Sequence, residues 1–200
     1  PQSHLPVGEA YEAFIGRTRH VPTRDGLHDF FNGLCWARFP RAKRRLNTLQ
    51  SEAIARQGIQ PQRGPLRDAL TLFDENGAFW DPPAALREAL AARQWRRLFQ
   101  DLRALWQAHP PVLFGHGLLT QLVSPRKPAT ARVLLIDSAT HSGADEAESD
   151  RDIRLVAALD QGPLAAARLL PLPVLGVPGW WPANEVPAFY DDAAVFRPRQ

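Results

Sequence analysis

The chain of 200 residues has one cysteine, no methionine and no long apolar run. The lone Cys35 excludes an internal disulfide and fits a reducing compartment. Its neighbours Leu34 and Trp36 favour packing as a small apolar residue over a nucleophilic role. No stretch approaches the roughly 20 apolar residues that cross a bilayer, so no membrane partner is expected. Because the chain begins at Pro1, we also expect an upstream segment outside this sequence.

Common motifs of enzyme chemistry are absent as well. The sequence has no phosphate-binding P-loop, no GxGxxG, no GxSxG, no HExxH and no paired CxxC. These absences argue against common nucleotide-binding enzymes, α/β hydrolases, zincins and zinc ribbons. The formal net charge is only +3, so the overall charge does not indicate a nucleic-acid partner. Such a partner would need a local basic patch.

The patterns that are present predict a single α+β domain over residues 1–200. Apolar residues make up 44% of the chain and charged residues 22%, which is ordinary for a globular protein. We expect a small mixed sheet with a β-hairpin, several helices and a proline-rich C-terminal wrap. Helices are predicted over 25–39, 40–58, 81–93, 95–107 and 153–159. Strands are predicted at the start of 111–125, over 129–137, and in hairpins over 11–23 and 68–80. In the second hairpin Asn76-Gly77 is a typical pair for a tight turn.

Three segments are expected to differ from this regular body. Residues 1–10 form an N-terminal arm, and the small and acidic residues of 138–150 predict a mobile loop. Proline dominates 162–200, which excludes a regular helix or a central strand there. Aromatic residues in the same stretch argue against disorder. We therefore expect an extended segment, rich in proline and tryptophan, that wraps around the domain.

The helix predicted over 25–39 has an unusual polar face. At 100° per residue, Asp25, His28, Asp29 and Asn32 fall within an arc of about 100°. Carboxylate, imidazole and amide groups are ligands of divalent cations, so these four residues are candidate metal ligands, with His28 and Asp29 also candidate catalytic groups. The alternative is a solvated helix face on which Asp25 is only a capping residue.

A cluster of positive charge follows this helix. Arg41, Arg44 and Arg45 could hold phosphate groups, since a guanidinium group binds phosphate oxygens in pairs. The alternative is a solvated face of the helix predicted over 40–58. A cation that activates water, beside arginines that hold phosphate, is the arrangement of a phosphodiesterase.

Two more candidates for catalysis lie later in the chain. Alternation in the predicted hairpin places Asp74 in line with apolar side chains, where burial would raise its pKa or require a partner. His116 stands between two glycines, which allow a backbone or a ligand to come close. Trp180 and Trp181 could form a stacking platform for a base, a sugar ring or a peptide, or could instead anchor the C-terminal segment to the core.

Most of the chain resembles a bacterial family of unknown function, domain of unknown function 3025. The stretches that carry the resemblance are YEAFI, VPTRDGLHDFFNGLCWARFPRAKRRLNTLQ, RGPLRDALTLFDENGAFW, LFGHGLLTQLVSPRK and PLPVLGVPGWWPANEVPAFYDDAAVFRPR. The resemblance implies a bacterial, cytoplasmic protein. It implies no activity, so no catalytic residue is carried over from it.

Three hypotheses of function follow from the residues. The first is a metal-dependent hydrolase that uses a divalent metal ion and acts on a phosphate-containing substrate, nucleic acid included. The second is a non-catalytic module that binds protein or nucleic acid through the basic helix and the Trp180/Trp181 segment. The third is that all these residues are structural and form a buried hydrogen-bonded network. The hydrolase requires His28 and Asp29 to line an open cleft with another carboxylate or histidine close by.

Overall fold

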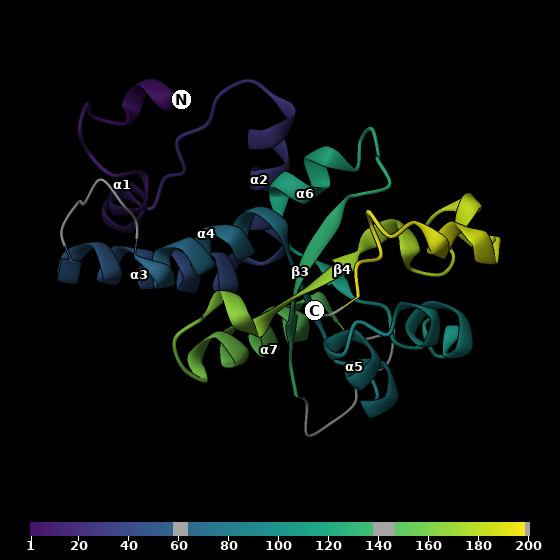
Figure 1. Ribbon diagram of the computed structural model, residues 1–200. Coiled ribbons are helices and arrows are strands. Elements are labelled where there is room, and N and C mark those ends of the chain that lie inside the picture. The colour runs from purple at the N-terminus through teal and green to yellow at the C-terminus, as the bar shows by residue number, and fades with distance from the viewer. Residues whose placement is uncertain (58–63, 138–146, 199–200) are drawn as a thin grey trace.

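The computed structural model describes residues 1–57, 64–137 and 147–198. Within these ranges the chain forms one α+β domain with a small mixed sheet and several helices, as predicted. The helices pack on both faces of the sheet (Figure 1). The sheet consists of β1 (Gly77–Trp80), β2 (Val112–Leu113), β3 (Thr130–Leu135) and β4 (Leu169–Pro173). Their order across the sheet is β2-β1-β3-β4.

The two central strands are parallel, and both outer pairs are antiparallel. Ala78 in β1 lies opposite Val133 in β3, and Val133 lies opposite Leu170 in β4. Because β1 and β3 run in the same direction, their carboxyl ends meet at one edge of the sheet. The prolines of β4 fit its position at the edge, where a missing N–H does not interrupt the sheet.

The α-helices lie around this sheet. They are α1 (Tyr11–Thr18), α2 (Leu27–Arg38), α3 (Pro40–Gln57), α4 (Pro65–Asn76), α5 (Ala84–Ala91), α6 (His116–Gln121) and α7 (Glu148–Asp160). In Figure 1, α1, α3 and α4 lie to the left of the sheet, and the yellow C-terminal segment lies to the right. The short α6 packs against both α2 and α4. Among the described residues, we find no helix with the length and apolar character to span a membrane.

A separate apolar core lies on each side of the sheet. Side chains alternate along β1, so Trp80 joins one core and Phe79 joins the other. In the first core Trp80 stacks on Trp106 at a centroid distance of 4.7 Å. In the second, Phe73 of α4 stacks on Phe114 at 5.1 Å. This second core fixes the end of α4 against the segment that leads into α6.

Both predicted hairpins are wrong. Residues 11–18 form α1, which ends at Arg19 in the left-handed region with φ 58°. Residues 68–76 belong to α4, and the strand begins only at Gly77. A Cβ at Gly77 would collide with the carbonyl oxygen of Phe73, so this glycine lets the chain leave the helix and enter the sheet at once. The Asn76-Gly77 pair therefore marks a helix exit, and the predicted alternation around Asp74 does not occur.

Several element boundaries also differ from the prediction. The helix expected over 95–107 is divided into a π-helical turn (Arg97–Asp101) and a 3-10 turn (Arg103–Leu105). The helix α7 begins at Glu148, earlier than expected, so the end of the predicted acidic loop is helical. The rest of that loop, 138–146, lies outside the described residues.

The C-terminal segment contains β4 and a series of short 3-10 turns. Tyr190 and Phe196 are buried in the first core, and the indole N–H of Trp95 donates to the carbonyl of Arg197 at 2.7 Å. The aromatic residues thus hold this segment against the domain, as the wrap predicted from the sequence requires.

Candidate metal site

One residue of the polar face of α2, Asn32, turns toward the protein interior. Asn32 is buried, whereas Leu27, Phe30 and Leu34 are exposed. Asn32 can be buried because both ends of its amide are used: its Nδ2 donates to the Tyr11 hydroxyl at 3.2 Å, and its Oδ1 accepts from Lys43 Nζ at 2.9 Å. A simple solvated face is therefore ruled out for this part of α2.

Three potential metal ligands from three helices meet beside this face. His28 lies in the first turn of α2, Glu75 in the last turn of α4, and His116 begins α6. One nitrogen or oxygen atom of each lies within 4.8 Å of the others. Glu75 Oε1 is 3.4 Å from His116 Nε2 and 3.7 Å from His28 Nε2. We call these three residues the His–Glu–His cluster.

Glycines on both sides of His116 allow this approach. A Cβ at Gly115 would overlap the backbone of Gly77 and of residues 75 and 76, so only glycine lets α6 begin so close to the end of α4. A Cβ at Gly117 would overlap Oε2 of the Glu75 carboxylate. The close approach expected from the Gly-His-Gly sequence is therefore confirmed, and the group that comes close is Glu75 together with its backbone.

A second set of polar groups lies on the Nδ1 side of the His116 ring. Its Nδ1 faces Asp74 Oδ2 at 3.8 Å, on the side of the ring opposite Glu75. Asp74 accepts from Lys43 Nζ at 2.5 Å, and Lys43 is itself only 3% exposed. Within the described part of the chain, the buried Nδ1 of His116 has no hydrogen-bond partner. One nitrogen of this ring thus faces the cluster, and the other faces an anchored carboxylate.

Charge and burial define the protonation of the neighbouring groups. A hydrogen bond from the His116 imidazole lowers the pKa of the Glu75 carboxyl from its ordinary value of 4.5, so Glu75 is ionised at neutral pH. Burial raises the pKa of Tyr11 to about 12 and that of Cys35 to about 11. The Cys35 thiol donates to the carbonyl of Phe114 at 3.2 Å. Neither the phenol nor the thiol is a nucleophile at neutral pH in these surroundings.

Two imidazoles and one carboxylate are a ligand set of catalytic zinc sites, which leave a fourth position for water or substrate. A tetrahedral zinc ion holds its ligand atoms about 3.3–3.4 Å apart, close to the distances between Glu75 and the two histidines. The His28 side chain is 46% exposed, so the cluster is open to solvent on that side. The chemistry of these donors, and the two distances from Glu75, fit a divalent cation with an accessible coordination position.

The structure brings together only some of the residues chosen from the sequence. His28 and His116 are in the cluster, and Asp74 supports it. Asp29 instead accepts from the backbone N–H of Arg24 at 2.6 Å.

The other two predicted ligands also lie outside the cluster. Asp25 is exposed, and Asn32 is committed to Tyr11 and Lys43. Glu75 was missed because the wrong hairpin placed it in a turn. A helix that ends at Asn76 places Glu75 in its last turn, next to the Gly-His-Gly segment.

The predicted phosphate-binding arginines lie elsewhere on α3. Arg41, Arg44 and Arg45 line one open pocket of about 280 Å³ between α3 and α7. Arg45 also pairs with Asp160 at 2.6 Å. These three arginines lie about 100–200° around the helix from Lys43, which faces the cluster, so they point away from it.

The two tryptophans do not form an exposed platform. Trp180 is partly buried against the first core and lines a cavity described below. Trp181 is also partly buried.

Comparison with known proteins gives one match. Residues 1–200 match a family described as "Protein of unknown function (DUF3025)". No curated protein and no solved structure matched the chain. The match spans the whole chain, and the protein therefore belongs to the DUF3025 family.

Proposed function

We propose that this protein is a metal-dependent hydrolase in which His28, Glu75 and His116 hold a divalent cation. The observation that carries the proposal is the convergence of these three donors from three separate helices, with Asp74 placed behind His116. Metal-binding histidines commonly face a carboxylate with their second nitrogen, and Asp74 faces Nδ1 of His116 at 3.8 Å.

The orphaned nitrogen of His116 supports this assignment. The His116 imidazole hydrogen-bonds Glu75 through Nε2, and among the described residues its buried Nδ1 is left without a hydrogen-bond partner. A cation held on Nε2 would leave Nδ1 as the nitrogen that carries the proton, and Asp74 Oδ2, 3.8 Å away, is the carboxylate oxygen that this N–H would face. Lys43 Nζ donates to Asp74 Oδ1 and keeps this facing carboxylate in place.

A cation held in this way lowers the pKa of bound water to about 7 and polarises an oxygen of the substrate. The proposed substrate class is a phosphate ester, nucleic acid included. Because Arg41, Arg44 and Arg45 face away, the cation itself is the positive group proposed to hold the substrate phosphate. A bacterial, cytoplasmic setting belongs to the same proposal and agrees with the free, buried thiol of Cys35.

The test is hydrolysis of bis(p-nitrophenyl) phosphate by protein loaded with Zn²⁺ or Mn²⁺. We expect turnover that is lost in Glu75→Gln and His28→Ala and unchanged in His4→Ala, which removes an exposed histidine that is not part of the cluster. Turnover that persists in Glu75→Gln, or equal rates with and without EDTA, would contradict the proposal.

A second candidate is a module that binds nucleic acid without catalysis. It is favoured by the three arginines that line one pocket of α3 and α7. Fluorescence anisotropy with a labelled DNA duplex would show binding that weakens steeply with salt and weakens further in Arg44→Gln. Equal affinity of Arg44→Gln and the wild type would exclude this pocket as the binding surface.

A further inference from the structure

One face of α2 is apolar and exposed to solvent. Its three large side chains belong to Leu27, Phe30 and Leu34, which are 54%, 59% and 47% exposed. At 100° per residue, these three and the small exposed residues Gly33 and Ala37 fall within an arc of about 120°. No polar side chain of α2 falls inside that arc. Because a surface helix ordinarily turns polar residues outward, this face is suited to contact with another apolar surface.

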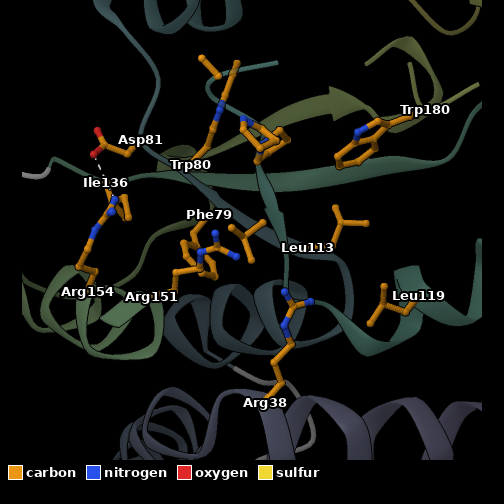
Figure 2. A pocket seen from close by; sticks show the side chains of 14 residues that line it. Arg38, Phe79, Trp80, Asp81, Leu113, Leu119, Ile136, Arg151, Arg154 and Trp180 are labelled. Atoms are coloured by element: carbon orange, nitrogen blue, oxygen red, sulfur yellow. Dashed lines mark hydrogen bonds and ion pairs between the residues drawn. The ribbon is translucent and has the colours of Figure 1, made fainter. Parts of the chain in front are cut away.

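The charged residues at the two ends of this face are paired within the chain. At the N-terminal end Arg24 Nε lies 3.4 Å from Asp29 Oδ2, and at the C-terminal end Arg38 Nε lies 2.6 Å from Glu148 Oε1. Figure 2 shows Arg38 pointing from α2 into a cavity of about 330 Å³ that Trp180 also lines. The guanidinium group of Arg38 therefore turns away from the apolar face. The face offers no charge that would select an acidic or a basic partner.

The exposed area is close to what a small dimer interface needs. Half-exposed leucine and phenylalanine side chains leave on the order of 100 Å² each, so the three provide about 300 Å² per copy and about 600 Å² in a pair. Homodimer interfaces are about 65% apolar, and a specific interface buries at least about 1,000 Å² in total. Such an interface needs about 650 Å² of apolar surface. The three large side chains supply nearly all of it, and Gly33 and Ala37 add the rest.

The order of these residues along α2 fits a second copy of the same chain. Leu27 and Leu34 stand at equal distances, about 5 Å along the helix, from a midpoint between residues 30 and 31. When two α2 helices pack antiparallel about a two-fold axis at this midpoint, Leu27 of one protomer lies opposite Leu34 of the other, and the two Phe30 side chains meet at the centre. The exposed Asp25 residues of the two protomers are then about 16 Å apart, too far for strong repulsion. We propose that this protein forms a homodimer through the apolar face of α2.

The dimer does not depend on the proposed metal site. His28 lies at least about 100° around α2 from Leu27, Phe30 and Leu34, so its ring stays outside the contact. The dimer can therefore be tested in EDTA, where no metal ion can bridge two chains. Its failure would leave the proposed hydrolase untouched, and failure of the hydrolase would leave the dimer untouched.

Sedimentation equilibrium of the full chain in EDTA, at about 1–200 μM, tests the proposal. We expect a monomer–dimer equilibrium in the wild type. Phe30→Asp should weaken association at least about 100-fold, because it places a charge at the centre of the contact. Val186→Asp is the matched control, since Val186 is 59% exposed in the C-terminal segment, and it should leave association within about twofold of wild type. Circular dichroism of each variant would show that the fold is kept.

Disulfide formation under copper–phenanthroline tests the antiparallel arrangement. Cys35 is only 3% exposed and should not form a link. Phe30→Cys should link to a second copy of itself readily, because the two positions meet at the axis. Leu27→Cys and Leu34→Cys should link to each other in a mixture and much more slowly alone, because like positions are about 10 Å apart along the axis and a disulfide spans at most roughly 7 Å between Cα atoms.

Three results would overturn the inference. A wild type that stays monomeric up to about 200 μM would assign the face to a different partner. Equal association of Phe30→Asp and the wild type would place the dimer contact on another surface. Leu27→Cys that links alone as fast as it links to Leu34→Cys would exclude the antiparallel pairing of α2.

Discussion

Replacing Lys43 by methionine should destabilise the protein strongly, because it leaves a partly buried carboxylate without its partner. Lys43 Nζ lies 2.5 Å from Asp74, with side-chain exposures of 4% and 24%. Removing one partner of a buried ion pair typically costs about 3–5 kcal/mol. Because water reaches Asp74 in part, we expect a loss of about 2–3 kcal/mol for Lys43→Met.

The reverse substitution should cost at least as much. Asp74→Asn leaves the ammonium group of Lys43, which is more deeply buried than its partner, without a negative charge. We expect about 3 kcal/mol from this variant. The double variant Lys43→Met/Asp74→Asn buries no unpaired charge, so its loss should fall short of the sum of the two single losses by at least about 1 kcal/mol.

Urea unfolding at pH 7, followed by circular dichroism, measures all four free energies of unfolding. Additive losses, within about 0.5 kcal/mol, would show that the two groups do not act as a pair. A loss below about 0.5 kcal/mol in both single variants would contradict the burial on which the reasoning depends.

Three further predictions concern single positions. Gly33→Ala should raise the free energy of unfolding by about 0.5–1 kcal/mol, because Gly33 lies within α2 with open space around it. Gly115→Ala should lower the free energy of unfolding by about 3 kcal/mol, because the added Cβ would collide with backbone atoms. Thermal unfolding of the two variants compares these effects. Because the pKa of Glu75 is lowered in the folded protein, the ionised carboxylate contributes stability that is fully present above pH 4.5 and is lost as the pH falls through the lowered pKa. In acid unfolding curves, the free energy of unfolding of Glu75→Gln should therefore fall less steeply below pH 4.5 than that of the wild type. Cys35, with a pKa of about 11, should react with iodoacetamide at pH 8 at least about 100-fold more slowly in the native than in the unfolded protein.

Long elements with a clear period could be predicted from the sequence. Helix α2 was expected over 25–39 and spans Leu27–Arg38, and α3 was expected over 40–58 and spans Pro40–Gln57. The strand β3 lies within the predicted 129–137. In these segments the local pattern and the packing favour the same structure.

The residues around Gly77 could not be predicted in this way. Asn-Gly fits a tight turn and a helix exit equally well, and the choice depends on distant contacts. Phe73 stacks on Phe114, which is far along the chain, and this contact draws the end of α4 into the second core. The wrong turn hid Glu75, the one carboxylate of the cluster.

The orientation of α2 was also beyond local reasoning. Asn32 on its polar face turns inward because its side chain hydrogen-bonds Tyr11 on α1 and Lys43 on α3. These partners come from other helices, and their positions depend on the whole fold. His28 and His116 were identified separately by residue type and neighbours, but only the fold shows that they meet at Glu75.

Titration of Zn²⁺ into metal-free protein at pH 7.5 tests the account most directly. Wild type and His4→Ala should each bind one Zn²⁺ per chain, and Glu75→Gln and His28→Ala should bind at least about tenfold more weakly. Circular dichroism of each variant would show that the fold is kept. Zn²⁺ that does not bind to the wild type, or that binds equally well to Glu75→Gln, would contradict the metal site.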